Sequence, residues 1–246
     1  MGDYIRCIES LSAAFQKMHQ GVVNMIHMEY ILEDIVRILT VVPFTLLSAV
    51  LILAVGVALG MVWALIQLYR IPVLSGAVKG LIACIRGVPL LIHLYLAYCF
   101  LPGVIQALFG PETEVPALAV MLAAYGIYIS AGQSENMKGA FTAVEQGQWD
   151  AAASIGMGRW QTLKRVVFPQ MVRIVTPVIF NSYLGVVKGM SLAFTIGVQD
   201  IMAVAKLCSL ENYGYLESYI AAGLVYWALC QMMGTGFKKL ETAIPY

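Results

Sequence analysis

The chain has 246 residues, of which 60% are hydrophobic and 12% are charged, and its formal net charge is +1 at pH 7. Soluble domains carry roughly 25% charged residues, so this composition excludes an ordinary soluble protein and indicates a membrane protein. The near-zero net charge gives no overall field that would attract nucleic acid. The scattered cysteines, which form no C-x-x-C pair, indicate neither a disulfide framework nor a metal site.

The N-terminal part of the chain is more polar than the rest and lacks the basic and apolar regions of a cleavable signal peptide. Its charged residues include Asp3, Arg6, Glu9 and Lys17. We predict that 1–29 form an extracytoplasmic or interfacial amphipathic segment. An extra membrane span is the alternative, which the polarity disfavours. The transmembrane domain is then 30–240, followed by a cytoplasmic tail over 241–246.

The apolar segments predict an all-α membrane protein, because a helix needs about 20 mostly apolar residues to cross the hydrocarbon core. The sequence offers about five such segments. The fourth carries Pro177 and gives way to a second apolar stretch, which Gln199 and Asp200 interrupt. In chain order, the expected spans are 38–69, 79–108, 115–134, a fourth that begins near 171 and continues as 191–207, and 215–233.

The distribution of Lys and Arg orients these spans, because basic residues gather in cytoplasmic connections. The connection near Glu112 has no basic residue. The basic residues of the other connections and the C-terminus are Arg70, Lys79, Lys138, Arg159, Lys164, Arg165, Arg173, Lys238 and Lys239. The first and third connections and the C-terminus are therefore predicted to be cytoplasmic, with the N-terminus outside.

The third connection, 145–170, is a polar interruption with strong helix signals. Alanines 151–153 favour a helix, and Asp150 near its start complements the helix dipole. Gly156 is well placed for a left-handed helix end, a second helical segment follows over 159–168, and Pro169 marks the entry to the next span. Asp150 and Gly156 could simply begin and end a helix that has no binding partner. A long, ordered connection between spans nevertheless favours a docking surface.

The chain resembles a known family at this loop. Asp150-Ala151-Ala152, then Gly156 and Pro169, resemble the EAA loop of ATP-binding-cassette (ABC) importer permeases, with Asp in place of the usual Glu. Gly147-Gln148 and Pro169-Gln170 are similar to the polar amino-acid branch. Three further segments resemble that branch in order and spacing: Arg86 to Leu91 (RGVPLL), Glu135 to Ala140 (ENMKGA) and Lys188 to Leu192 (KGMSL).

The resemblance implies the type I importer permease fold and a multi-pass protein of the bacterial inner membrane. It implies that the loop docks on a cytoplasmic ABC ATPase dimer, that a second permease subunit (the same chain or a paralogue) completes the pathway, and that an extracytoplasmic binding protein delivers an amino acid. Membrane lipid surrounds the chain, and no nucleic acid is involved. The implied ATPase-coupling residues are Gly147, Gln148, Asp150, Ala151, Ala152, Gly156, Pro169 and Gln170.

A few polar residues within the spans are candidates for the pathway or its gate: Arg86, Glu135, Lys188 and Ser191. An intramembrane charge is costly and suggests function, although Arg86 also suits a snorkelling anchor at the cytoplasmic interface. Lys188 has three alternatives: a pair with Glu135, a pair with Asp200, or a position facing the pathway.

The KGMSL segment departs from the family pattern. Gly189 and Met190 stand where Asp and Thr are usual, so a charge and a hydroxyl are lost beside Lys188.

The sequence argues against two other function classes. A membrane hydrolase would need a motif such as H-E-x-x-H or G-x-S-x-G, and neither occurs. A channel or scaffold would not need a structured docking loop. The chain also lacks a G-x-x-x-x-G-K-[ST] phosphate loop, so we predict that it has no catalytic site or cofactor of its own. The partner ATPase would bind ATP and Mg²⁺.

Overall fold

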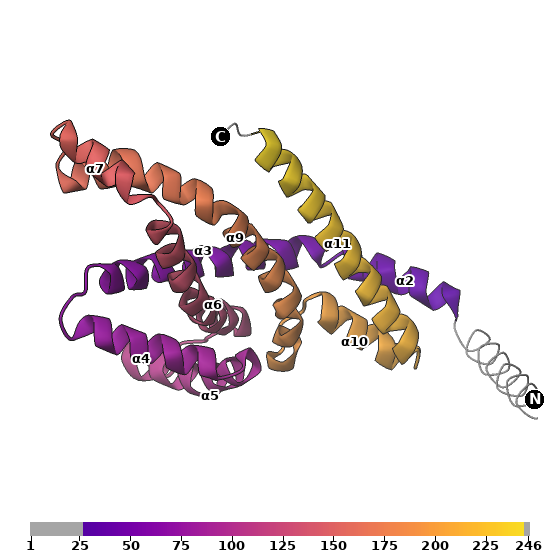
Figure 1. Ribbon diagram of the computed structural model, residues 1–246. Helices are drawn as coiled ribbons and strands as arrows, with labels where there is room; N and C mark the ends of the chain where they lie inside the picture. The colour runs from indigo at the N-terminus through magenta and orange to yellow at the C-terminus, as the bar shows by residue number, and fades with distance from the viewer. Residues whose placement is uncertain (1–26, 244–246) are drawn as a thin grey trace, which may run out of the picture.

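The structure is a computed structural model that describes residues 27–243, with side chains described up to residue 239. The prediction for 1–29 lies outside the described residues up to residue 26, and that for the tail lies outside them from residue 244. Within the described part the regular elements are all helical (Figure 1). The elements are α2 (Met28–Leu39), α3 (Val42–Leu68), α4 (Leu74–Gly87), α5 (Leu90–Phe109), α6 (Ala117–Thr142), α7 (Gln146–Ser154), α8 (Arg159–Thr162), the π-helical η1 (Leu163–Val167), α9 (Phe168–Gly189), the 3₁₀-helical η2 (Met190–Ile196), α10 (Ile201–Glu211) and α11 (Tyr215–Ala243).

The described helices confirm the expected number of spans, since 5 are long and apolar enough to cross a membrane. These are Val42–Leu68, Leu90–Phe109, Ala117–Thr142, Arg159–Ile196 and Tyr215–Lys239. The fourth combines α8, η1, α9 and η2 into one long helical rod. Asp200 interrupts the apolar stretch after it, as expected, because its side chain caps α10 by accepting a hydrogen bond from the Ala203 N–H at 2.9 Å.

The second expected span is wrong as a single helix. Val88 is extended, with φ −113° and ψ 133°, and it separates α4 from α5. The cause is Pro89, because the proline ring disfavours helical geometry in the residue before it. Only α5 has the length and hydropathy of a span, whereas α4 is a separate helix of 14 residues.

Helices α3 and α6 form the central pair and approach each other through glycines. A Cβ atom on Gly56 would lie 2.7 Å from Ile129 Cγ2, and one on Gly126 would lie 2.7 Å from Val55 Cγ1. Gly60 is similarly close to Gln133, at 2.7 Å from its Cβ. Small residues let membrane helices pack backbone to backbone. This tight pairing fixes the position of the polar end of α6, which extends past the predicted limit at 134 to Thr142.

Helices α2, α10 and the beginning of α11 form a second packed unit, at the opposite side of the picture from α7 (Figure 1). Ile38, Ile201 and Ala221 are fully buried between them. A buried hydrogen bond of 2.5 Å from the Ser218 hydroxyl to the Asp34 carboxylate ties α11 to α2. The unit therefore holds α2 against the body of the protein.

Candidate functional site

Helix α7 confirms the predicted loop helix and begins at Gln146. It ends as predicted, because Gly156 has a φ of +80°. The Gly156 N–H donates to the Ala153 carbonyl and the Met157 N–H donates to the Ala152 carbonyl, both at 3.0 Å. These bonds satisfy the last carbonyls of the helix, and the left-handed geometry favours glycine at 156.

The second half of the loop also confirms the prediction, with one addition. Helix α8 continues through the π-helical turn η1 into α9 without a break, and Pro169 lies in the first turn of α9. Proline lacks an N–H and its ring clashes with the carbonyl of the residue four positions earlier. The widened π turn directly before Pro169 lets the helix pass through this position.

One side of α7 is anchored to the membrane helices. Ala152 is 4% exposed, and the Trp149 ring packs on Phe141 at the end of α6, with ring centroids 5.8 Å apart. The Gln170 side-chain amide donates to the Gln148 amide oxygen at 3.3 Å, which joins α9 to α7. The two Gln residues that frame the predicted coupling element are therefore in contact.

The other side of α7 is open. The predicted coupling residues on it are Gly147, Asp150, Ala151 and Gly156, all exposed. Two exposed apolar residues extend this surface, Ile155 at 77% and Trp160 at 74%. These two residues are not among the predicted coupling residues, although large apolar residues inside a polar connection are a sequence signal of a contact surface.

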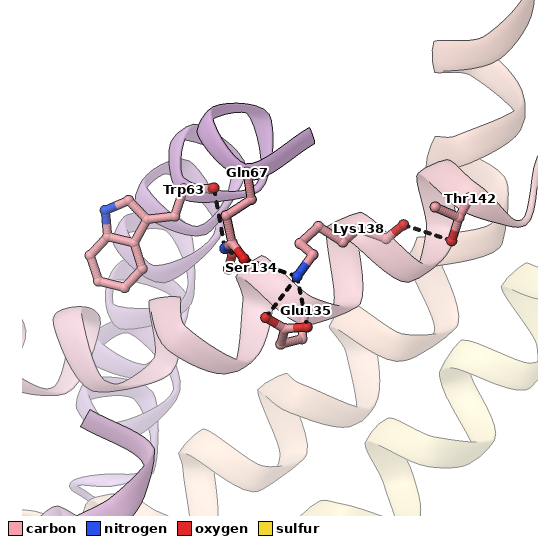
Figure 2. A network of polar contacts seen from close by, with 6 residues as sticks. All are labelled: Trp63, Gln67, Ser134, Glu135, Lys138 and Thr142. Carbon is pink, nitrogen blue, oxygen red and sulfur yellow. Dashed lines mark hydrogen bonds and ion pairs between the residues drawn. The ribbon is translucent and has the colours of Figure 1, made fainter. Parts of the chain in front are cut away.

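A polar network joins the ends of α3 and α6 (Figure 2). The Lys138 ammonium donates to the Glu135 carboxylate at 3.1 Å and to the Gln67 amide oxygen at 3.0 Å. The Gln67 amide in turn donates to the Ser134 hydroxyl at 3.2 Å. The network neutralises Glu135 with a neighbour on its own helix and fastens that helix to α3.

Lys188 pairs with neither of the carboxylates proposed for it. Glu135 is occupied by Lys138, and Asp200 accepts hydrogen bonds from the Ala203 N–H at 2.9 Å and the Tyr226 hydroxyl at 3.4 Å. Lys188 is exposed and makes no ion pair with a residue of the described segment. It lines a cavity of about 400 Å³ together with Ser191, Tyr219 and Tyr226.

The four pathway candidates fall into two separate groups. Lys188 and Ser191 share the cavity between α9, η2, α10 and α11. Arg86 and Glu135 share another, of about 550 Å³, between α3, α4 and α6. Arg86 also reaches a third cavity of about 500 Å³, lined by Tyr125 and Tyr128. The structure does not bring the two groups together within one cavity.

The departure from the family pattern at 189 and 190 has a packing explanation. A Cβ atom on Gly189 would overlap the hydroxyl of Tyr125 and lie 3.1 Å from its Cζ atom. Tyr125 is 3% exposed, so its ring cannot move aside freely, and Met190 is fully buried in the same core. Apolar packing therefore replaces a charge and a hydroxyl here.

Comparison with known proteins agrees with this architecture. The family model for "Binding-protein-dependent transport system inner membrane component" matches residues 56–241. The chain is 33% identical, over 84% of its length and 90% of the relative's, to the probable amino-acid permease protein YxeN of Bacillus subtilis (strain 168). It is 31% identical, over 86% of its length and 89% of the relative's, to the L-cystine transport system permease protein TcyL of the same organism.

A solved amino acid ABC transporter, crystallised with histidines, has the same fold, with a TM-score of 0.78 and 24% identity over 89% of this chain and 100% of that chain. The family model covers most of the chain, and the relatives align over nearly their full length. The protein is therefore a member of the family of inner-membrane components of binding-protein-dependent transport systems, the permeases of ABC importers.

Proposed function

We propose that this chain is the permease subunit of an ATP-driven, binding-protein-dependent importer of polar amino acids or their derivatives. The relatives named above carry names of amino-acid and L-cystine permeases, which supports this class of solute. A second permease subunit completes the pathway, a separate ATPase binds ATP and Mg²⁺, and a solute-binding protein delivers the amino acid.

The observation that carries the coupling role is the two-sided character of α7. Trp149 holds the helix to the end of α6 and Gln148 links it to α9, while Asp150, Ala151 and Gly156 stay exposed. A helix anchored on one side transmits a push on its free side to the membrane helices. The ATPase contacts the free side, and its closure moves α9 through the continuous rod formed by α8 and η1.

The orientation follows the distribution of Lys and Arg, which places α7 and the C-terminus in the cytoplasm and the N-terminus outside. In Figure 1, α7 and the C-terminal end of α11 lie in the upper part of the view and α2 lies away from both. Lys188 and Ser191 then line part of the pathway, because both face the open cavity between α9, η2, α10 and α11.

Reconstitution tests this function. The chain is placed in liposomes with its cognate ABC ATPase and solute-binding protein, and uptake of labelled amino acids is measured with and without ATP. We expect uptake only with ATP and the binding protein, and none when the phosphate-loop lysine of the ATPase is replaced. Uptake that persists with the inactive ATPase would show a channel instead. ATP-driven uptake of another solute but of no amino acid would contradict the solute class alone.

A further inference from the structure

The cavity between α3, α4 and α6 carries an unusual excess of positive charge. Its volume is about 550 Å³, and its lining includes Lys79, Arg86 and Lys138 but only one carboxylate, Glu135. That carboxylate is 3.1 Å from the Lys138 ammonium and compensates it. Lys79 and Arg86 form no hydrogen bond or ion pair with a side chain in the described part of the protein, so two cations remain uncompensated beside the bundle.

The two uncompensated cations come from one helix and project into the same cavity. Lys79 and Arg86 lie about two turns apart along α4, which puts them on one face. Val78, Ile82 and Ile85 are buried and pack with Ala131 of α6. The apolar side of α4 thus holds the helix in place and keeps both cations at the mouth of the cavity.

Exposed apolar residues lie on the same helix as the two cations, on a different face from them. Leu74 and Leu81 of α4 are 45% and 48% exposed, and Val73 before the helix is 91% exposed. α4 therefore combines paired cations with uncovered hydrocarbon along a short helix that does not span the membrane. This combination matches an amphiphile with an anionic head and an apolar tail, rather than a purely polar solute.

We propose that this cavity binds a phosphate-bearing anion, held by Lys79 and Arg86, and that its source is the headgroup of an anionic phospholipid. Arg guanidinium and Lys ammonium groups are the usual partners of phosphate oxygens, and basic cavities between membrane helices accept lipid headgroups. Gln67 and Lys138 link the same cavity to α3 and α6, so the bound lipid braces α4 against the central helix pair.

Lipid retention tests the proposal. The full-length chain is purified in detergent, incubated with equal amounts of phosphatidylglycerol and phosphatidylcholine, and its bound lipids are counted by native mass spectrometry. We expect preferential retention of phosphatidylglycerol, and a decrease of about 25-fold in K79Q/R86Q, because each of the two cations near a headgroup contributes about fivefold in affinity. The matched control, R173Q/K238Q, removes two exposed cations elsewhere and is expected to retain the wild-type preference.

Further variants and conditions control for misfolding of the double variant and distinguish a lipid headgroup from free phosphate. K79R/R86K keeps both charges and should keep the preference, and K79Q alone, at an exposed position, should lose part of it even if the double variant does not fold. In phosphatidylcholine nanodiscs, added inorganic phosphate should not raise the melting temperature. If phosphate raises it in the wild type but not in K79Q/R86Q, the site binds phosphate from solution. Equal phosphatidylglycerol retention by wild type, K79Q and K79Q/R86Q, with no response to phosphate, overturns the proposal.

Discussion

The hydroxyl of Tyr125 on α6 occupies the space that a side chain at Gly189 on α9 would need. The same hydroxyl donates to the Val186 carbonyl at 3.4 Å, which holds the ring against α9. The two helices therefore meet through a large residue on one and a missing side chain on the other. This pair accounts for glycine at position 189 in this chain, because a side chain there would overlap the Tyr125 hydroxyl.

Gly189→Ala should destabilise the protein, because the new methyl group meets a buried ring that has no free space. Tyr125→Phe removes the overlapping atom, so G189A should cost less in the Y125F background. The coupling between the two changes should be about 1–3 kcal/mol of unfolding free energy, measured by a double-mutant cycle in detergent.

Gly185→Ala is the matched control for that cycle. A Cβ atom at 185 meets nothing within 4 Å, so the change should be neutral or stabilising by up to about 1 kcal/mol, since alanine favours helices over glycine. If G189A and G185A have the same free energy of unfolding, the Tyr125 contact does not limit the side chain at position 189.

Gly156→Val tests the coupling surface. The φ of +80° at this position is unfavourable for a branched side chain, so the turn after α7 should distort and the exposed face should no longer fit its partner. We expect ATPase stimulation and uptake to fall several-fold while the amount of membrane-inserted protein stays the same. Both are measured in proteoliposomes against an inserted-protein standard.

Gly158→Val supplies the comparison, because Gly158 has a φ of −69° and a ψ of 156°, which any residue adopts. Neither glycine has a neighbour within 4 Å of a built Cβ atom, so the variants differ in backbone strain and not in crowding. Equal coupling in G156V and G158V would refute a role for the left-handed turn.

The membrane class, the five spans and the loop helix were predictable because each depends on local signals: hydropathy, helix formers and a glycine stop. The break before Pro89 was also predictable, because proline restricts the backbone of Val88. The high hydropathy of the whole segment nevertheless favoured a single continuous helix. Two contacts were not predictable, because each joins different helices. One is the hydrogen bond from Lys138 to Gln67, and the other is the packing of Tyr125 that requires glycine at position 189. The roles of Lys188 and Ser191 stay predictions for the same reason: sequence spacing does not say which cavity a side chain enters.

Gln67→Leu should loosen the junction of α3 and α6. Gln67 is 7% exposed and contacts both Lys138 and Ser134, so leucine leaves those groups without their buried partner. Removing one partner of a buried hydrogen bond costs about 1–3 kcal/mol. Chemical unfolding should show this loss, while Thr142→Val, at an exposed position on the same network (Figure 2), should stay within about 0.5 kcal/mol of wild type. Equal stability of the two variants would argue against the network as a clamp.

The ion pair between Arg37 and Glu211 should make the attachment of α2 sensitive to acid. The guanidinium donates to both carboxylate oxygens, at 2.5 and 3.1 Å, and this contact lowers the pKa of Glu211 below its ordinary value of 4.5. A carboxylate with a lowered folded-state pKa stabilises the protein above its unfolded pKa, and this contribution disappears as the pH falls through the folded pKa.

The melting temperature should therefore fall more steeply in the wild type than in Glu211→Gln when the pH is lowered from about 7 to below about 4.5, because only the wild type has this contribution to lose. High salt should reduce the difference in melting temperature between the two proteins at neutral pH, since the ion pair is exposed and is screened by salt. Parallel pH profiles for the two proteins would mean that the ion pair forms in the structure without contributing to the stability of the α2, α10 and α11 unit.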